Sequence, residues 1–441
     1  MLVPAYPALL AAFPDAREIA RPHDLGGLLP GCRLLEARSA DGLILWLLDH
    51  PPYFDRAGNP YLGPEGHDWL DNHLRFGLLS RVAAWLGSGE NSLAWHPDIV
   101  HCNDWQAALA PVFLATLPGR QARSVVTVHN LAFQGLFGHA ALAELGLPAS
   151  AWHIDGVEYH GYLSFLKGGL QHADWITTVS PTYAREIQTD EEGMGLAGLL
   201  RFRAERLTGI LNGIDLTTWN PARDAHLAKA YDAAHLGNKA PNKLAVQREL
   251  GLEHRSDLPL LGVVSRLTEQ KGLDLVLTVA ATLAARPAQL AVLGSGDKTM
   301  ELAFRQLTEQ WPGRIAVRVG FNEPLAHRIE AGADIFLMPS RFEPCGLNQM
   351  YSLRYGTPPV VRATGGLADT VVDAYDPKKG NGFVFVEPTA AALAMTIDRA
   401  ITAWHNKKHW HTIQKHAMAC DFGWDSPARQ YTLIYERLAR L

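Results

Sequence analysis

The sequence predicts an α/β protein with two doubly wound lobes, and three observations lead to this prediction. Short apolar, β-rich runs alternate with longer helical patterns from about Pro97 onward. The same alternation starts again after a polar stretch at residues 240–243. In addition, a chain of 441 residues exceeds what one hydrophobic core usually holds. We therefore expect a first lobe over residues 1–215 and a second over residues 216–420.

In the first lobe, apolar runs at residues 98–101, 124–128 and 174–179 predict strands. A helical stretch follows the first run through Leu117, and Pro181 suits the first turn of a further helix. Runs that are apolar throughout are typical of strands buried on both faces, which favours a parallel sheet covered by helices.

The second lobe repeats this organisation, with a predicted helix at residues 273–285. Its predicted strands lie at residues 258–264, 289–293, 314–319, 334–338 and 358–361. Ligands of such sheets bind at the carboxyl ends of the strands. The residues directly after each strand are therefore the candidate site residues.

Composition and charge argue against several classes of protein. The formal net charge of −5 is unlike that of a general nucleic-acid binder, which presents a basic face. No apolar run reaches the roughly 18 residues that a membrane span requires. The four cysteines match no metal or redox spacing, and they are Cys32, Cys102, Cys345 and Cys420. We expect a cytoplasmic protein.

Arg266 and Lys271 follow the strand that opens the second lobe and lie beside the start of a helix. Arg offers a planar fork of donors, Lys offers a mobile point charge, and the helix N-terminus adds its dipole. These features suit the binding of a diphosphate. The alternative interpretation is a pair of solvated surface cations.

Glu343 lies in the segment Ser-Arg-Phe-Glu-Pro-Cys-Gly-Leu at residues 340–347, again directly after a predicted strand. A carboxylate there could bind sugar hydroxyls or stabilise positive charge at an anomeric carbon. The alternative is a glutamate that caps its own helix. Cys345 by itself is more typical of a small buried hydrophobic residue than of a nucleophile.

Three further segments end predicted strands or connect elements. Gly365 and Gly366, after Thr364, allow the backbone to approach an anion closely, although a plain turn is the alternative. Asp104 and His129 follow neighbouring strands of the first lobe, so we expect them at one rim as an acid/base or hydroxyl-binding pair. A strand-end histidine is also often structural. Asn212 by itself belongs to a turn.

Two glycine-rich matches are set aside. Residues 193–198 fit G-x-G-x-x-G but follow a polar segment instead of a strand. Residues 294–296 follow a strand, but Thr299 stands where the third small residue belongs. Neither a G-x-x-x-x-G-K-[ST] motif, nor H-E-x-x-H, nor D-x-D occurs, so a kinase-type phosphate loop, a zinc hydrolase and a metal-bound nucleotide-sugar site lack support.

Taken together, these segments resemble the bacterial glycogen synthase and plant starch synthase family of retaining glucosyltransferases. The Ser-Arg-Phe-Glu-Pro-Cys-Gly-Leu segment is highly specific, and the matching runs follow the family order over nearly the whole chain. They lie at residues 126–130, 164–170, 178–184, 211–215, 265–272, 339–347 and 364–369.

The resemblance implies two Rossmann-like lobes of the GT-B type with the active site in the cleft between them. It also implies that residues 421–441 form a C-terminal helix that returns to the first lobe. The expected donor is ADP-glucose and the expected acceptor is the non-reducing end of an α-1,4-glucan. Configuration is retained, and no metal or other cofactor is expected because Arg and Lys supply the positive charge.

The resemblance also assigns roles to individual residues. Arg266 and Lys271 bind the diphosphate, Glu343 holds the glucose, and His129 contacts the sugar. Asp104 is expected at the acceptor side with two aromatic residues, Tyr61 and Trp105. The remaining donor-binding residues are Asn212, Cys345, Gly346, Leu347, Thr364, Gly365 and Gly366.

One departure from the family concerns the N-terminus. The family begins with a strand and a Lys-x-Gly-Gly-Leu loop upstream of a Leu-Pro-Ala-Tyr-Pro-like segment. Here a similar segment stands at residues 3–7, so a first lobe without that strand, loop and lysine is predicted. Residues 24–28 do not replace the loop, because they come later and lack lysine. We expect either an internal start of the recorded chain, which the intact remaining sites favour, or a truncated form with little activity.

Two rival functions remain. A related glycosyltransferase with another donor or a small acceptor usually carries a second Glu eight residues after the first, where this chain has Tyr351. That difference favours the glucan synthase. The other rival is a catalytically impaired protein that binds a glucan or a nucleotide sugar.

Overall fold

The computed structural model describes residues 1–22, 32–89, 91–117, 121–283 and 286–440, and it divides the chain into two compact units. Unit 1 comprises Met1–Thr178, Ala184–Thr208 and Tyr431–Leu441, and unit 2 comprises Val179–Tyr183 and Gly209–Gln430. Two features of the sequence lie outside the described residues. They are the Asp-Leu-Gly-Gly-Leu segment at 24–28 and the last two residues of the helix predicted at 273–285.

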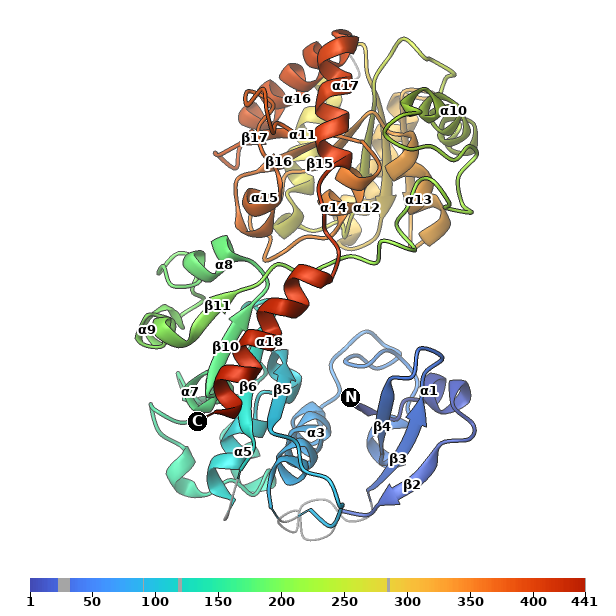
Figure 1. Cartoon of the computed structure of the whole chain (residues 1–441). Helices are drawn as coiled ribbons and strands as arrows, with labels where there is room; N and C mark the ends of the chain where they lie inside the picture. Colours follow the sequence, from blue (N-terminus) through green and yellow to red (C-terminus); the bar gives the residue numbers. More distant parts are fainter. Residues whose placement is uncertain (23–31, 90, 118–120, 284–285, 441) are drawn as a thin grey trace. The chain divides into compact units, whose positions relative to one another are not determined.

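Unit 2 contains one six-stranded parallel sheet with the strand order β14-β13-β12-β15-β16-β17 (Figure 1). All five strands predicted from the sequence of this lobe are confirmed to within two residues at either end. The six strands are β12 (Leu260–Val264), β13 (Gln289–Gly294), β14 (Ile315–Val319), β15 (Ile335–Met338), β16 (Pro359–Arg362) and β17 (Phe383–Phe385).

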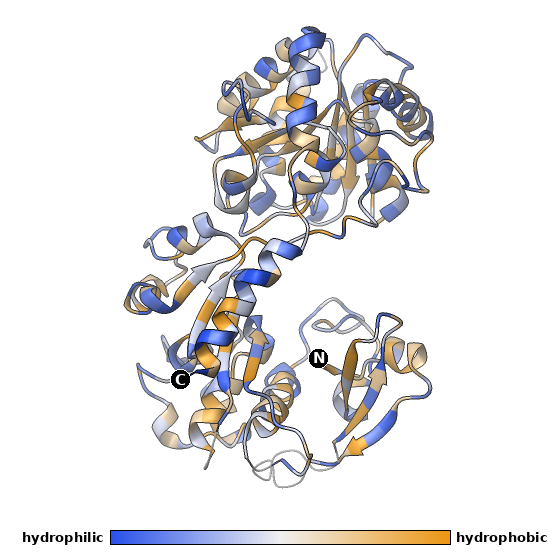
Figure 2. Ribbon diagram, in the orientation of Figure 1, coloured by the Kyte–Doolittle hydropathy of each residue, from blue (hydrophilic) through white to orange (hydrophobic). Residues whose placement is uncertain are grey.

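Helices cover both faces of this sheet, and the apolar strands form the interior of the unit (Figure 2). Side chains of Asp297, Asn322 and Thr389 accept backbone N–H groups at three helix starts, which explains where those helices begin. The helices are α10 (Lys239–Leu250), α11 (Leu273–Leu283), α12 (Lys298–Gln310), α13 (Glu323–Gly332), α14 (Asn348–Arg354), α15 (Gly365–Thr370), α16 (Ala390–His405) and α17 (Lys407–Met418).

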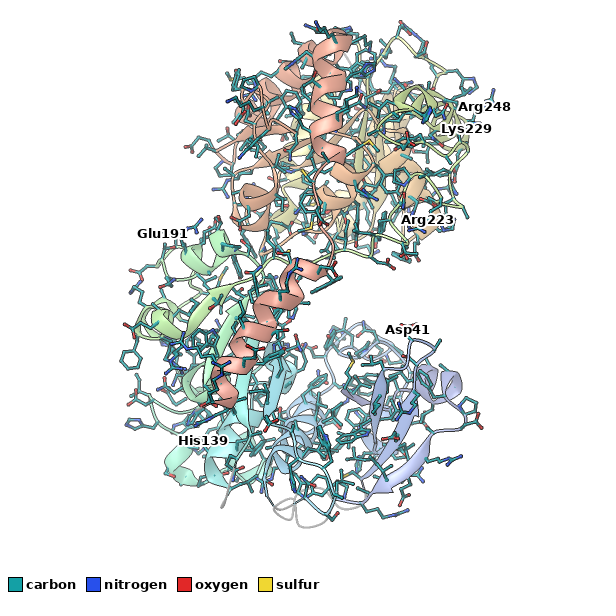
Figure 3. The ribbon with its side chains drawn as sticks, in the orientation of Figure 1. Asp41, His139, Glu191, Arg223, Lys229 and Arg248 are labelled. Atoms are coloured by element: carbon teal, nitrogen blue, oxygen red, sulfur yellow. The ribbon has the colours of Figure 1, made fainter. Side chains whose placement is uncertain are left out.

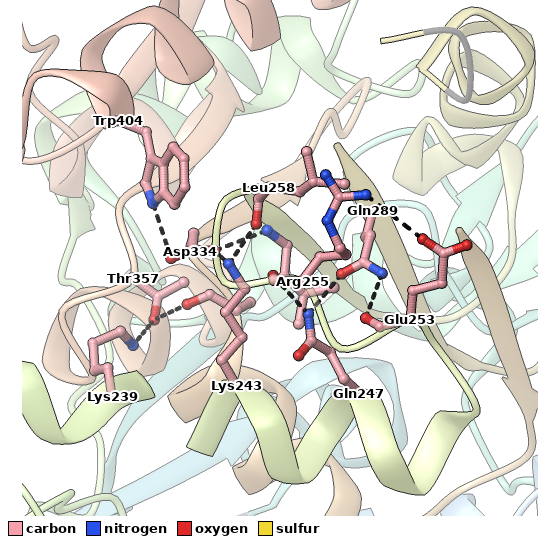
Figure 4. A network of polar contacts seen from close by, with 12 residues as sticks. Lys239, Lys243, Gln247, Glu253, Arg255, Leu258, Gln289, Asp334, Thr357 and Trp404 are labelled. Carbon is pink, nitrogen blue, oxygen red and sulfur yellow. Dashed lines mark hydrogen bonds and ion pairs between the residues drawn. The ribbon is translucent and has the colours of Figure 1, made fainter. Parts of the chain in front are cut away.

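A buried polar network ties α10 and α16 to the amino ends of the central strands (Figure 4). The Lys243 ammonium lies 2.6 Å from a carboxylate oxygen of Asp334, directly before β15, and 2.5 Å from the carbonyl oxygen of Leu258. The second Asp334 oxygen accepts the indole N–H of Trp404 at 2.9 Å. A buried ion pair is tolerated when its remaining hydrogen-bonding positions are used. The network therefore fixes the end of the sheet opposite the candidate site.

Unit 1 holds two four-stranded sheets and a small three-stranded one. The first sheet has the order β1-β4-β3-β2, in which only β1 and β4 pair in parallel. Its strands are β1 (Leu2–Pro4), β2 (Arg17–Ala20), β3 (Arg33–Arg38) and β4 (Ile44–Asp49). Helices α1 (Pro7–Ala12), α2 (Pro51–Phe54) and α3 (Asn72–Gly87) accompany it. This mostly antiparallel sheet lies before Pro97, where the predicted alternation begins.

The second sheet of unit 1 has the order β11-β10-β6-β5 and includes the three strands predicted from the sequence. These are β5 (Ile99–Asn103), β6 (Arg123–Val128) and β10 (Trp175–Thr178), which pair in parallel, and β11 (Leu207–Gly209) joins them. The third sheet contains β7 (Leu136–Phe137), β8 (Glu158–Tyr159) and β9 (Tyr162–Ser164).

The helical stretch predicted through Leu117 consists of two short helices, α4 (Asp104–Ala107) and α5 (Ala110–Thr116). Pro111 stands in the first turn of α5, a position that needs no backbone donor, so a second helix starts there. The other helices of this region are α6 (Ala141–Glu144), α7 (Phe165–His172) and α9 (Ala197–Phe202). Helix α8 (Pro181–Glu186) belongs to unit 2 up to Tyr183 and to unit 1 from Ala184.

The C-terminal helix α18 spans Asp425–Ala439, and its residues from Tyr431 onward belong to unit 1. The Tyr435 hydroxyl lies 2.6 Å from Nδ1 of His101 on β5, and Nε2 of the same ring lies 2.6 Å from the Thr127 hydroxyl on β6. Burial, with a smaller effect of His129, lowers the pKa of His101 to about 4. A neutral imidazole therefore joins α18 to the sheet.

Charged side chains lie on the outside of both units, and Figure 3 labels Glu191, Arg223, Lys229 and Arg248 among them. Within the described residues, no helix is long and apolar enough to cross a membrane.

Candidate active site

The predicted donor-side residues gather at the carboxyl ends of three adjacent strands of unit 2. Arg266 and Lys271 follow β12, Glu343 follows β15, and Thr364 follows β16. Because β12 pairs with β15 and β15 with β16 in parallel, their carboxyl ends meet at one edge. The topology therefore brings together segments that lie up to about a hundred residues apart in the chain.

Lys271 and Glu343 form an ion pair at this edge. The Lys271 ammonium lies 2.5 Å from Oε2 of Glu343, and the Ser340 hydroxyl donates to the same oxygen at 2.9 Å. Only 6% of the Glu343 side chain and 17% of the Lys271 side chain are exposed. The alternative that Glu343 merely caps its own helix receives no support, since Leu347 stands at the N-cap of α14 and no side chain caps that end.

Arg341 holds the two loops of this ion pair together. Its guanidinium makes a bidentate pair with Asp274 on α11 at 2.6 and 2.7 Å and donates to the carbonyl oxygen of Glu269. Its backbone N–H donates to the carbonyl oxygen of Gln270 at 2.8 Å. The loop that carries Lys271 is thus fastened to the loop that carries Glu343. No role for Arg341 was predicted from the sequence.

Gly365 and Gly366 pack directly on the Glu343 loop. Gly365 has a φ of 44°, and a Cβ there would lie 2.0 Å from the carbonyl oxygen of Glu343. A Cβ at Gly366 would lie 1.9 Å from the carbonyl oxygen of Cys345. The Gly366 N–H donates to the carbonyl oxygens of Glu343 and Pro344 at 3.1 and 3.2 Å. The two glycines therefore allow their backbone to lie close to the backbone of the Glu343 loop. Phosphate binding by Thr364–Gly366 stays a prediction.

Cys345 is buried, and burial raises the pKa of its thiol to about 12, opposed by the backbone N–H of Asn212. Burial therefore disfavours the thiolate, which is the nucleophilic form, in agreement with a small buried hydrophobic residue. Asn212 and Cys345, both predicted at the donor side, therefore lie together. Gly346 adopts a φ of 69°, and Leu347 is half-exposed beside it.

A cavity of about 350 Å³ opens beside Arg266 in unit 2. Its walls come from the ends of β12, β13 and β14 and from one face of α13 and α14. Its lining residues include Ser265, Arg266, Gly294, Ser295, Phe321, Asn322, Ala326, Glu330, Asn348 and Tyr351. The Arg266 side chain makes one long contact, 3.5 Å to Gln270, so its donors are largely unused within the described structure.

Most of this cavity was missed by sequence reasoning. The 294–296 segment does not fit a dinucleotide motif, yet Gly294 ends β13, Ser295 follows it, and both line the cavity. Phe321 lies two residues after β14 and is 90% exposed. Its position just after a predicted strand was a usable signal in the sequence, whereas its exposure was not. Glu330 lies well inside a helix and gave no such signal.

In unit 1 the parallel pairing of β5 and β6 brings Asp104 and His129 to one rim, as predicted. Oδ1 of Asp104 accepts the backbone N–H of His129 at 2.7 Å, while Nε2 of the imidazole lies 2.9 Å from Oδ1 of Asn103. Burial raises the pKa of the Asp104 carboxyl, opposed by His129 and by backbone N–H groups. Asp104 therefore contacts the backbone of His129, whereas the imidazole of His129 contacts Asn103.

The two aromatic residues predicted at the acceptor side both contact Phe76. The ring centroid of Trp105 lies 4.9 Å from that of Phe76, and that of Tyr61 lies 6.0 Å from it. Tyr61 is 43% exposed, in a loop whose N–H groups bond to the side chain of Asn59. No group of three or more His, Cys, Asp or Glu residues in the described part of the chain could hold a metal ion.

Residues 1–202 match the family described as the starch synthase catalytic domain, and residues 251–417 match glycosyl transferases group 1. The glycogen synthase of Dechloromonas aromatica is 59% identical over 99% of this chain and 90% of that protein. The glycogen synthase of Aromatoleum aromaticum is 53% identical over 99% of this chain and 89% of that protein.

Among solved structures, the catalytic domain of Arabidopsis thaliana starch synthase IV, bound to ADP and acarbose, superposes with a TM-score of 0.86. It is 31% identical, and the match covers 100% of this chain and 92% of that one. The sucrose-phosphate synthase of Thermosynechococcus elongatus, at 18% identity and a TM-score of 0.57, shares the fold alone.

Proposed function

Since the chain belongs to the glycogen and starch synthase family of GT-B glycosyltransferases, we propose that it transfers glucose from ADP-glucose to the non-reducing end of an α-1,4-glucan. The observation that carries the proposal is the Lys271–Glu343 pair. Lys271 shares its loop with Arg266, which lines the cavity in unit 2. Two cations and a buried carboxylate suit a diphosphate bonded to a sugar. The starch synthase IV structure, which contains ADP, supports the choice of nucleotide.

In the proposed reaction, the bond between glucose C1 and the diphosphate oxygen breaks. The 4-hydroxyl of the glucan bonds to C1 from the same face, and its proton passes to the departing diphosphate. Arg266 and Lys271 stabilise the negative charge that builds on the diphosphate, in place of a metal ion. The Glu343 carboxylate accepts hydrogen bonds from the glucose and stabilises positive charge at C1.

On unit 1 we assign the acceptor-side roles to Asp104, His129, Tyr61 and Trp105. The exposed Tyr61 ring offers an apolar face of the kind that packs on sugar rings. Asp104 and His129 offer hydrogen-bonding groups to sugar hydroxyls. These assignments rest on the family resemblance, together with the position of Asp104 and His129 on one rim of the second sheet and the contacts of Tyr61 and Trp105 with Phe76.

We also place the reaction in the cytoplasm. The four cysteines are free thiols, as is usual in a reducing compartment, and three of them are buried.

The test is incorporation of labelled glucose into glycogen from ADP-glucose, with UDP-glucose at equal concentration as the matched control. We expect incorporation from ADP-glucose and a much lower rate from UDP-glucose. Transfer from UDP-glucose alone would overturn the donor assignment. Binding of ADP-glucose and glycogen without transfer would instead favour the impaired binding protein.

A further inference from the structure

Glu330 is a buried carboxyl group in the wall of the cavity beside Arg266. It is 1% exposed, and its Oε2 has no hydrogen-bond partner within the described residues. Buried polar atoms are nearly always hydrogen-bonded, so an unpartnered oxygen in a cavity wall points to a ligand. Among the described residues with such an unpartnered buried atom, Glu330 alone also lines this cavity.

The geometry of α13 directs Glu330 to the cavity. Asn322, Glu323, Ala326 and Glu330 all line it, and the last two are four residues apart on one helix face. Phe321, directly before this helix, lines the same cavity and is 90% exposed. The cavity thus combines an exposed aromatic ring with a polar group deeper in the wall, as in sites for flat heterocyclic ligands.

The Lys239 ammonium, the nearby charged group, already donates its hydrogen bonds to other oxygens. Lys239 donates to the carbonyl oxygens of Ala331 and Tyr355 at 2.7 and 3.1 Å and to the hydroxyls of Thr357 and Tyr231 at 2.8 and 3.3 Å. In the part of the chain that the structure describes, none of its hydrogen bonds reaches the Glu330 carboxyl. The group therefore keeps hydrogen-bonding capacity for a ligand.

Burial raises the pKa of Glu330 well above its ordinary value, and the charge of Lys239 opposes this rise. A protonated carboxyl presents an O–H donor beside a carbonyl acceptor, the same pair that a glutamine amide presents. Such a pair can bond to the adenine edge that carries the 6-amino group and a neighbouring ring nitrogen.

An aromatic stack makes this wall rigid. The Trp219 ring lies between Tyr351, at a centroid distance of 3.7 Å, and His327, at 3.8 Å, with interplanar angles below ten degrees. Nδ1 of His327 lies 2.7 Å from Oδ2 of Asp224, which fixes the ring. Because His327 stands three residues before Glu330 on α13, the stack also fixes the helix face that carries Glu330.

We propose that Glu330 is a specificity-determining residue that reads the polar edge of the donor's adenine through a paired donor and acceptor. The inference rests on the proposed function, since it takes the nucleotide to occupy the cavity beside Arg266. An adenine ring lying against Phe321 would present its 6-amino group to the carbonyl of Glu330 and a ring nitrogen to its O–H. A 6-oxo base presents an acceptor where the carbonyl of Glu330 requires a donor, and it would bind less well.

The experiment measures calorimetric binding of ADP, inosine diphosphate and inorganic diphosphate to the full chain. ADP and inosine diphosphate differ only in the base, at C6 and the adjoining N1 proton, and inorganic diphosphate reports the phosphate contacts alone. We expect the unaltered chain to prefer ADP to inosine diphosphate by roughly tenfold, the effect of one or two hydrogen bonds. Glu330→Met should bring this ratio close to one without weakening the binding of inorganic diphosphate.

Glu330→Gln is the matched control, because it keeps both hydrogen-bonding groups and nearly the same shape. It should retain the preference for ADP, and its folding should be unaltered. An unchanged preference for ADP in Glu330→Met, or a lost preference in a folded Glu330→Gln, would overturn the role of Glu330 and leave the proposed function standing. Failure of the unaltered chain to bind ADP would overturn the proposed donor as well, so the two failures are distinguishable.

Discussion

In both units most candidate site residues follow the ends of parallel strands, but the two units hold these residues by different interactions. Unit 2 has one continuous six-stranded sheet, and its site contains two ion pairs, Lys271 with Glu343 and Arg341 with Asp274. In unit 1 the strands divide among two four-stranded sheets and a three-stranded one, and the Asp104 carboxylate accepts the backbone N–H of His129. Fixed opposite charges suit a ligand whose charge changes during reaction, whereas backbone donors suit hydroxyl groups.

This contrast leads to a general expectation for substitutions. Removing a charge in unit 2 leaves its buried partner unpaired and also removes a group that would meet the diphosphate. Removing the Asp104 side chain in unit 1 removes a hydrogen bond to a backbone N–H and leaves no charged partner unpaired among the residues that the structure describes. Four experiments test this expectation, beginning with the substitution that should cost the most activity.

Glu343→Ala should lower the rate of glucose transfer by roughly 100- to 1,000-fold, the effect of removing a well-placed charged group at a reacting centre. The fold should be retained, as checked by circular dichroism. Glu309→Ala on the exposed face of α12 is the matched control and should leave the rate unchanged. Near-normal turnover in folded Glu343→Ala would refute the role of this carboxylate.

Lys271→Ala should weaken the binding of ADP-glucose by roughly 10- to 100-fold, since a charge-assisted hydrogen bond contributes about 1.5–3 kcal/mol. Glycogen binding should change much less. Lys298→Ala provides a control, because this side chain is 87% exposed. Equal losses for donor and glycogen would count against a phosphate-binding role.

Arg341→Lys should reduce kcat/KM for ADP-glucose by about tenfold, because lysine cannot reproduce the bidentate pair with Asp274. Arg341 acts as a positioning residue through Lys271 and Glu343, so the loss should lie mainly in kcat once the donor is saturating. Exchanging the charges in an Arg341→Asp, Asp274→Arg double variant should recover part of the loss relative to Arg341→Asp. A loss confined to thermal stability would contradict this role.

Acidification should destabilise unit 1 through His101, whose pKa in the folded chain is about 4. In the unfolded chain His101 binds a proton near pH 6.5, whereas in the folded chain it does so only near pH 4. The free energy of unfolding therefore falls as the pH drops from 6.5 to 4. From pH 7.5 to 5.5 the contribution is about 1 kcal/mol in the free energy of unfolding.

The measurement for His101 is denaturant unfolding at a series of pH values, followed by a probe in unit 1. His101→Gln should make the pH dependence shallower by this amount, with a small offset at neutral pH from the altered contact to Tyr435. An identical pH dependence in the two proteins would show that another group is responsible.

Prediction from the sequence succeeded where one local pattern implies one structure. The run at 289–293 corresponds to β13 (Gln289–Gly294) and the run at 334–338 to β15 (Ile335–Met338), because strands buried on both faces are apolar throughout. The antiparallel strands β2 and β3 were missed. They mix charged with apolar residues and lie outside the repeating pattern that identified the others.

The residue types at the strand ends, and hence the chemistry of a diphosphate and a sugar, were determined by the sequence itself. Arg266, Lys271 and Glu343 are identifiable from the order of residues alone, because a parallel sheet brings strand ends to one edge. The partner of each group, the hydrogen bond from Gly366 to the Glu343 loop and the position of Glu330 in a cavity wall became known from the three-dimensional structure. The physical reason is that burial and hydrogen-bond partners depend on packing between segments far apart in the chain, which no local pattern encodes.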